Sequence, residues 1–285
     1  MPWVFVLIWS TGFVAARFGM PHAPPMTFLA IRYAASVLCF GVWIVLAGAV
    51  WPRERMQWAH LAATGVLMHA GYLGGVWSAV KAGIGAGTVS LLVGLQPLLT
   101  AIWLTTTAAH RDHGRVSPRQ WLGLLLGLAG LALVVWRKLG VGEITLSNLA
   151  LALGALLSIT AGTLYQKHFV APCDVRTANS VQLMAALLVT APLAWIESES
   201  IVWHPQLIGA MGWSVLVLTL GGSSLLYLLI QRGAATQVTS LLYLVPPCTA
   251  LMAWALFGEA FTPTMLVGMA LTAVGVSLVV RSASR

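Results

Sequence analysis

The chain has 285 residues, of which 59 % are hydrophobic and only 8 % are charged. A soluble domain of this length could not hide so much apolar surface behind so few charges, so the composition excludes an ordinary soluble globular protein. It is typical of a polytopic membrane protein, whose outer faces are covered by lipid. The net charge of +8 therefore indicates membrane topology rather than binding to nucleic acid, because basic residues gather in the loops on one side of a membrane.

Ten apolar segments approach the roughly 20 residues that a helix needs to cross the hydrocarbon core. They span residues 3–20, 26–48, 57–80, 85–107, 118–137, 147–167, 176–196, 206–230, 235–257 and 263–281. The connections between them are too short to hold a soluble domain, so we predict an all-α fold of ten transmembrane helices. The chain enters the first segment without a basic leader or a small-residue cleavage site, which indicates that no signal peptide is removed.

The positions of lysine and arginine predict that both termini are cytoplasmic. With the N-terminus inside, the cytoplasmic side holds Arg53, Arg55, Arg111, Arg115, Arg119, Lys167, Arg176, Arg232, Arg281 and Arg285. The outer side holds Arg17, Lys81, Arg137 and Lys138, and Arg32 falls within the second segment. The excess of basic residues on the first side fixes this orientation.

The second half of the chain repeats the first. At an offset of 150 residues Gly71, Trp77 and the stretch 90–97 match Gly221, Tyr227 and the stretch 240–247, and at an offset of 145 the glycines of segment 118–137 match those of segment 263–281. Each half, 1–142 and 143–285, would hold five helices of one integral membrane domain. Because five is odd, the second half enters the membrane from the opposite side. Inverted repeats of this kind place a binding site near the midplane and give alternating access by rocking.

Pro97 and Pro247 lie near the middle of apolar segments in the two copies of the repeated stretch. A proline inside a helix removes one backbone hydrogen bond and displaces the carbonyl four residues earlier. In hydrocarbon such a carbonyl is tolerated only where neighbouring helices, side chains or water satisfy it. We therefore predict a polar cavity between the two halves, with both prolines as bending points.

Three stretches resemble the drug/metabolite transporter superfamily of the EamA type. Residues 27–33 are similar to the start of the family's second helix, with its arginine-aromatic pair, and both prolines fall where its fourth and ninth helices carry proline. Phe257-Gly258-Glu259, followed by Gly268 and Gly275, is similar to the end of a family repeat. The first half departs from this ending, because Gly114 stands where a glutamate is expected.

Within the superfamily, the stretch His69-Ala70-Gly71-Tyr72 makes the chain most similar to the YddG-like amino-acid exporters. The resemblance covers essentially the whole chain. It implies ten helices in two inverted repeats around a cavity lined mainly by helices 1, 3, 4, 6, 8 and 9. It also implies a transporter of the bacterial inner (plasma) membrane that needs no cofactor.

Acidic residues are absent from the centres of all ten segments. They are Glu54, Asp112, Glu143, Asp174, Glu197, Glu199 and Glu259, all at or near segment ends. A proton-coupled exporter of cations usually needs a buried acid that exchanges its proton for the cation. We therefore expect neutral or zwitterionic substrates, and we keep proton-coupled efflux of drugs or other cations as the alternative.

His69 is the titratable group nearest the middle of a segment, and Tyr72 shares its helix face. The two either form a hydrogen-bonding pair in the cavity or make a neutral structural contact with a neighbouring helix. Arg32 could pair with a substrate carboxylate, but we expect it to snorkel or to contact a backbone carbonyl.

Hydroxyl groups and aromatic rings recur on the faces of the other segments, a combination that suits amphipathic solutes. The residues that we expect to bind substrate are Trp9, Ser10, His69, Tyr72, Trp77, Ser90, Gln96, Ser158, Tyr165, Ser223, Tyr227, Ser240 and Tyr243.

Other chemistry is disfavoured. His110-Arg111-Asp112-His113 lacks a second ligand cluster, so we expect no metal site. Gly222-Ser223-Ser224 with His69 would suggest a membrane-embedded hydrolase, but no acid is placed to orient the histidine. Gly123, Gly127 and Gly130 form a small-residue face suited to close helix packing. We thus expect a transporter, possibly monomeric, that exports amino acids or similar small metabolites and is not an enzyme.

Overall fold

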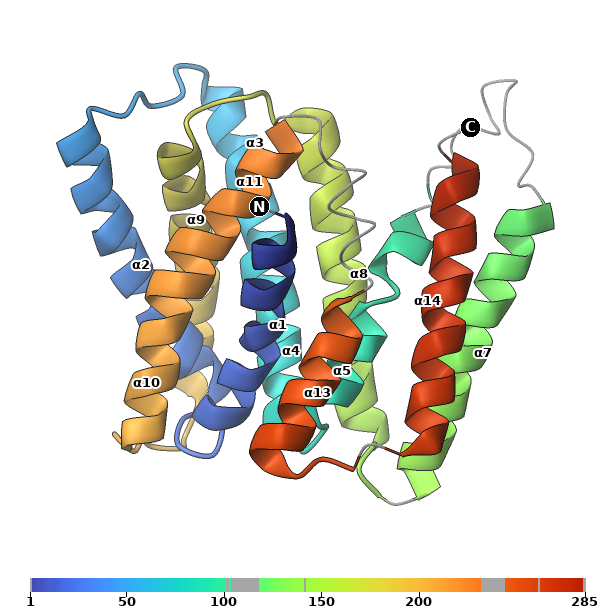
Figure 1. The fold of residues 1–285 in the computed structure, drawn as a ribbon. Coiled ribbons are helices and arrows are strands. Elements are labelled where there is room, and N and C mark those ends of the chain that lie inside the picture. The colour runs from blue at the N-terminus through green and yellow to red at the C-terminus, as the bar shows by residue number, and fades with distance from the viewer. Residues whose placement is uncertain are drawn as a thin grey trace.

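The computed structural model describes residues 2–100, 103, 118–140, 142–231, 244–260 and 262–283. Every regular element among these residues is a helix, and the helices run up and down through one bundle (Figure 1). The elements are α1 (Pro2–Gly19), α2 (Pro25–Ala47), α3 (Arg55–Gly65), η1 (Val66–Gly71), α4 (Tyr72–Lys81), α5 (Ala86–Val93), α7 (Pro118–Gly140), α8 (Leu146–Phe169), α9 (Val175–Ile196), α10 (Pro205–Trp213), η2 (Ser214–Ser223), α11 (Ser224–Gln231), α13 (Val245–Phe257) and α14 (Pro263–Ala283).

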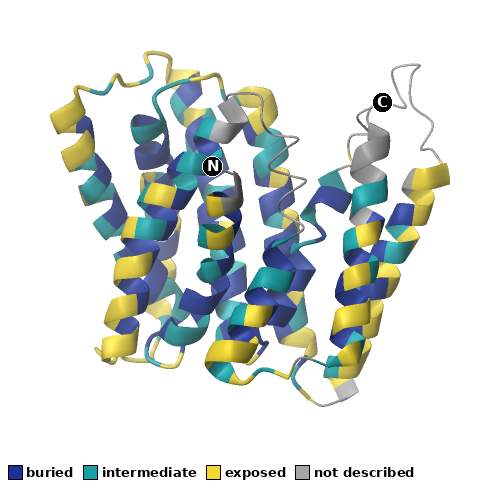
Figure 2. Cartoon of the chain, in the orientation of Figure 1, coloured by how far each residue is buried: buried dark blue, intermediate teal, exposed yellow. Residues whose placement is uncertain are grey.

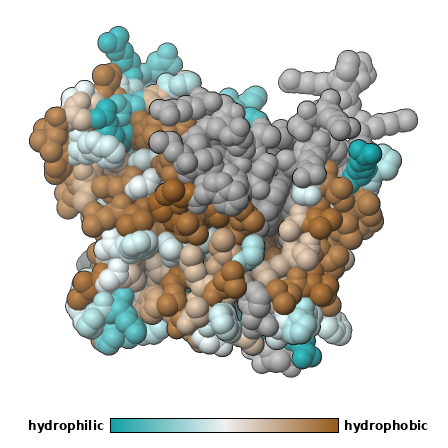
Figure 3. All heavy atoms as spheres, in the orientation of Figure 1, coloured by the Kyte–Doolittle hydropathy of each residue, from teal (hydrophilic) through white to brown (hydrophobic). Residues whose placement is uncertain are grey.

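Five helical stretches are long and apolar enough to cross a membrane: Pro25–Ala47, Trp121–Leu139, Leu146–Phe169, Val175–Ile196 and Pro205–Leu228. Their outward-facing residues are exposed while their inner faces are buried (Figure 2). Large apolar side chains such as Leu46, Trp136 and Trp195 are at least 80 % exposed, and apolar atoms form a broad band at mid-height (Figure 3). Lipid is the medium that such a surface requires, so the chain is a multi-pass helical membrane protein.

Two π-helical turns interrupt the bundle, η1 between α3 and α4 and η2 between α10 and α11. A π-turn accommodates one extra residue and leaves carbonyls poorly aligned for the normal helical hydrogen bond. Side-chain hydroxyls meet three of these carbonyls. Ser158 Oγ donates to Leu67 O at 2.8 Å, Tyr33 Oη to His69 O at 2.9 Å, and Thr219 Oγ1 to Ser214 O at 2.8 Å.

The two prolines differ from the expected mid-helix kinks. α5 ends at Val93, a turn follows at Gly94 and Leu95, and helix resumes at Gln96, so Pro97 lies just after a break. Pro247 lies in the first turn of α13, which begins at Val245. Amide groups in the first turn of a helix have no intrahelical partner, so among the described residues this proline begins a helix rather than bending one.

Polar contacts tie the helices together at the lower end of Figure 1. Glu197 accepts hydrogen bonds from the backbone amides of Met26 and Thr27 at 2.9 and 2.7 Å, and so caps the start of α2. Lys81 forms an ion pair with Glu199 at 2.6 Å and donates to Met20 O at 2.9 Å. The loops before α2, after α4 and before α10 are therefore bound to one another at this end.

Candidate substrate cavity

A cavity lies between α1, α2, η1, α4, α8, α9, η2 and α11. The space between its lining atoms is about 730 Å³, including the part open to solvent. Its lining residues are Trp9, Gly12, Phe13, Arg32, Met68, His69, Tyr72, Leu73, Val76, Trp77, Ile159, Gln166, Asn179, Gln182, Leu218, Ser223, Leu226 and Tyr227.

Residues 150 positions apart recur on the walls of this cavity. The pairs are Trp9 and Ile159, Arg32 and Gln182, Met68 and Leu218, Leu73 and Ser223, Val76 and Leu226, and Trp77 and Tyr227. The two π-turns follow the same offset, because adding 150 to Val66–Gly71 gives residues 216–221, within Ser214–Ser223. Residues that are 150 positions apart in the sequence therefore line the same cavity.

Arg32 is the cation of the cavity lining, and it is only 4 % exposed. Its Nε and Nη2 atoms donate to the hydroxyl of Thr219 at 3.1 and 3.0 Å, and its guanidinium lies 5.9 Å from the ring centre of Trp77. No carboxylate among the described residues pairs with it. The expectation that Arg32 snorkels or contacts a carbonyl is therefore wrong: it is a buried charge beside a cavity.

His69 and Gln182 extend the polar wall next to Arg32. Their side chains lie close enough to interact, and His69 also lies within electrostatic reach of Arg32. Gln182 is 3 % exposed, and its Nε2 atom has no hydrogen-bond partner among the described residues. Asn179, one turn earlier on α9, donates to Val175 O at 2.8 Å and also lines the cavity.

Aromatic residues also line the cavity. The side chains of Trp9 in α1 and Tyr72 in α4 lie close enough to interact. Trp77 is held by stacking on Phe28, with ring centres 4.3 Å apart. Tyr227 Oη lies 3.1 Å from Cys173 Sγ. Indole and phenol groups held in this way offer flat apolar faces together with polar edges, which suits an amphipathic solute.

The structure brings together six of the predicted binding residues in the cavity: Trp9, His69, Tyr72, Trp77, Ser223 and Tyr227. Five others lie outside its lining and bond elsewhere: Ser10 to Val6 O, Ser90 to Gly87 O, Ser158 to Leu67 O, Gln96 to Thr163 and Tyr165 to His60. Substrate binding by these five residues stays a prediction. Ser240, Tyr243, Gly114 and the stretch His110–His113 lie outside the described residues.

Sequence reasoning missed Gln166, Asn179 and Gln182 and misjudged Arg32. A signal for two of them was available, since the offset of 150 pairs Arg32 with Gln182. The same offset pairs His69 with Thr219, which receives the hydrogen bonds of Arg32. Arg32 of α2 contacts Thr219 of η2, and Gln182 of α9 contacts His69 of η1. The second contact joins the positions that the offset makes equivalent to those of the first.

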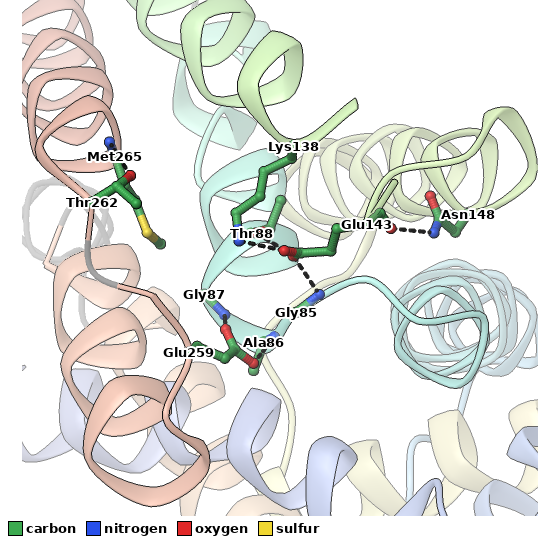
Figure 4. Close-up of polar contacts among 10 residues, drawn as sticks. All are labelled: Gly85, Ala86, Gly87, Thr88, Lys138, Glu143, Asn148, Glu259, Thr262 and Met265. Carbon is green, nitrogen blue, oxygen red and sulfur yellow. Dashed lines mark hydrogen bonds and ion pairs between the residues drawn. The ribbon is translucent and has the colours of Figure 1, made fainter. Parts of the chain in front are cut away.

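The acidic residues that the structure describes stay away from the cavity lining. Glu143 and Glu259 instead point from two different loops at the start of α5 (Figure 4). Glu143 accepts from Gly85 N and Thr88 Oγ1, both at 3.0 Å, and pairs with Lys138. Glu259 accepts from Ala86 N at 2.9 Å and Gly87 N at 3.3 Å. Both carboxylates cap a helix whose first amides would otherwise lack partners.

An apolar, multi-pass helical bundle around a partly polar internal cavity defines a membrane transporter. The chain belongs to the EamA-like transporter family, whose model matches residues 3–136 and again residues 146–281.

Relatives of known sequence are similar over nearly the whole chain. The uncharacterized transporter YwfM of Bacillus subtilis is 28 % identical, covering 99 % of this chain and 94 % of that protein. A probable amino-acid metabolite efflux pump of Salmonella typhimurium is 23 % identical, covering 95 % of this chain and 90 % of that protein. A solved crystal structure, described only as that of a protein, has a TM-score of 0.71 at 16 % identity, with 100 % of this chain and 97 % of the other covered. That likeness shows the fold alone.

Proposed function

We propose that the protein exports amino acids or similar small zwitterionic or neutral metabolites through this cavity by alternating access. Residues 1–142 and 143–285 would act as two inverted five-helix repeats that rock about the cavity, in a bacterial inner membrane and with both termini cytoplasmic. The family match in two successive parts of the chain supports the duplication. The pairs of equivalent residues on the cavity walls support a site between the two halves.

The observation that carries this proposal is the chemical character of the cavity. It combines hydrogen-bonding side chains and aromatic rings with apolar walls, and the described lining contains no carboxylate. Efflux of cations by proton antiport usually depends on a buried acid, so this lining favours a solute that is not cationic. The printed name of the Salmonella relative, an amino-acid metabolite efflux pump, points to the same substrate class.

Counterflow in proteoliposomes tests the proposal. Vesicles are loaded with an unlabelled amino acid mixture and diluted into trace labelled amino acid, with and without a pH gradient, and protein-free vesicles serve as the control. We expect transient accumulation of label that does not need the pH gradient. Accumulation that strictly requires the gradient, or that occurs only with cationic drugs, would support the antiport alternative instead. Absence of counterflow with every solute would argue against a transporter of this kind.

A further inference from the structure

Arg32 carries a charge that the described part of the protein does not neutralise. The guanidinium is nearly inaccessible, and its hydrogen bonds go to a neutral hydroxyl, that of Thr219. Burying a cation without a counter-ion is unfavourable, and binding of an anion removes part of this cost. Since Arg32 lines the cavity, a partner can reach it from the cavity.

Gln182 adds a second unsatisfied donor to the same wall. Its Nε2 amide group is buried without a partner among the described residues, while the rest of its side chain contacts His69. A buried donor left unpaired costs free energy, which an incoming acceptor recovers. His69 interacts with both Arg32 and Gln182, and all three residues line the cavity. Together they offer it one positive charge and a spare N–H group.

The charge and the hydrogen-bond donors of Arg32 and Gln182 indicate which chemical group of a ligand would bind to them. A carboxylate presents two acceptor oxygens and a single negative charge, which matches one guanidinium and one amide. A phosphate monoester carries more charge than this single cation compensates. The apolar part of the ligand would lie against Phe13, Leu73 and Leu226, which also line the cavity.

We propose that Arg32 and Gln182 form a carboxylate-binding subsite, so that the substrates are small amphipathic monocarboxylates whose amino group is dispensable. This inference rests on the proposed transport function and changes its substrate class, from zwitterionic or neutral metabolites to carboxylates that need no amino group. The aromatic faces of Trp9 and Tyr72 can attract an ammonium group, but the nearby charge of Arg32 opposes it, and the described lining supplies no carboxylate for it. A zwitterion therefore gains little over a simple carboxylate.

Three ligands with the same phenylethyl body separate the two charged groups: 3-phenylpropanoate has only the carboxylate, phenylalanine has both groups, and 2-phenylethylamine has only the ammonium. Their affinities for the purified full chain in detergent are measured by isothermal titration calorimetry at pH 7. Because charge-assisted hydrogen bonds carry the recognition, we expect 3-phenylpropanoate to bind at least about tenfold more tightly than 2-phenylethylamine. Phenylalanine should bind no more tightly than 3-phenylpropanoate. Equal or stronger binding of the amine would overturn the subsite.

Variants assign the effect to the two residues. Arg32→Met should weaken 3-phenylpropanoate binding about 10- to 100-fold, and Gln182→Leu about threefold to tenfold, with no loss for the amine. Arg176→Met is the matched control, because Arg176 pairs with Asp174 at 2.6 Å and is not part of the cavity lining. Unchanged carboxylate binding in a folded Arg32→Met protein would contradict the assignment.

Gln182→Glu keeps the test decisive if Arg32→Met fails to fold. This near-isosteric change places a carboxylate in the cavity lining that also holds Arg32, so we expect it to abolish binding of 3-phenylpropanoate and to raise the affinity for 2-phenylethylamine. A loss of folding cannot produce a reversed preference. If the variant still prefers the carboxylate, the subsite is wrong.

Transport and binding can fail separately. Binding of 3-phenylpropanoate that depends on Arg32, without counterflow of the labelled compound, would sustain the subsite and refute the transport function. Counterflow that does not depend on Arg32 would sustain the transport function and refute the subsite.

Discussion

His69 lies where a π-turn, a tyrosine and an amide meet. Tyr33 donates to its carbonyl oxygen at 2.9 Å, and its ring contacts Gln182. The sequence offered two alternatives for His69: a group in the cavity, or a structural contact with a neighbouring helix. In the structure His69 lines the cavity and also contacts neighbouring helices. Its ring supports the amide that we place in the carboxylate subsite, so its removal should affect substrate handling rather than membrane insertion.

Substitution His69→Ala should lower transport about fivefold or more, since it removes the polar side-chain contact that positions Gln182. The measurement is counterflow per molecule of protein, with abundance in the membrane determined by immunoblot. His168→Ala is the control, because His168 is exposed near the end of α8. Normal counterflow by His69→Ala at normal abundance would contradict the prediction.

The sequence placed aromatic side chains in the cavity more reliably than serine side chains, for a physical reason. Trp9, Tyr72 and Trp77 have long side chains, and all three line the cavity as predicted. Serine hydroxyls are short and bond readily to a carbonyl three or four residues earlier on their own helix, as Ser10 and Ser90 do. Helical spacing places a residue on a face but does not show where its hydroxyl donates.

At the scale of elements, α5 depends on residues far from it in sequence. The backbone amides at its start donate hydrogen bonds to two carboxylates: that of Glu143, in the loop before α8, and that of Glu259, in the loop before α14 (Figure 4). Gly85 allows this approach, because a Cβ there would lie 2.8 Å from Glu259 Oε2 and 2.9 Å from Glu143 Oε1. Both carboxylates also interact favourably with the positive end of the helix dipole.

Substitution Glu259→Ala should destabilise the protein by about 1–2 kcal/mol, since two amides at the start of α5 lose their acceptor. Thermal unfolding in detergent, followed by fluorescence-detected size exclusion, measures the change. Glu54→Ala is the control, because Glu54 precedes α3 but makes no capping hydrogen bond. Equal unfolding temperatures for both variants would show that the cap is not stabilising.

The pairing of α7 with α14 confirms that the glycines of α7 form a packing face. A Cβ on Gly275 would lie 2.4 Å from Gly123 O, and one on Gly268 would lie 2.8 Å from Gly130 O. These backbones are therefore in direct contact along the seam. Small residues at such positions are the usual means of close helix association in lipid.

Substitution Gly275→Ala should lower the unfolding temperature, because overpacking of this kind costs about 1–3 kcal/mol. Gly209→Ala, in α10, should have no effect or raise it, since no atom lies within 4 Å of the added Cβ and alanine favours a helix by roughly 1 kcal/mol over glycine. The same assay compares the two. A higher unfolding temperature for Gly275→Ala would be incompatible with the seam.

At the scale of the whole molecule, length and hydropathy predicted the ends of several described helices well and their internal form poorly. The segments expected at 26–48 and 176–196 correspond to α2 (Pro25–Ala47) and α9 (Val175–Ile196). The π-turns within Arg55–Lys81 and Pro205–Gln231 were not foreseen, because one additional residue in a turn changes neither the length nor the apolarity of a segment. Residues of both turns line the cavity.

Both termini lie toward the upper part of the bundle (Figure 1). We expect this end to be cytoplasmic, because the loop before α3, which carries Arg53, and the end of α14, which carries Arg281, lie there (Figure 1). Green fluorescent protein fused to either terminus should fluoresce, and alkaline phosphatase fused to the C-terminus should be inactive. An active phosphatase fusion would place that end outside and reverse the proposed orientation.

The lone charge of Arg32 also matters for handling the purified protein. An empty cavity would draw in whatever small anion the buffer supplies, and any ligand that binds only the folded state raises its stability by mass action. Formate or acetate salts should therefore raise the unfolding temperature more than salts of large, poorly fitting anions at equal ionic strength. Such ions would also compete in titrations, so the choice of counter-ion sets the apparent affinity of every carboxylate measured.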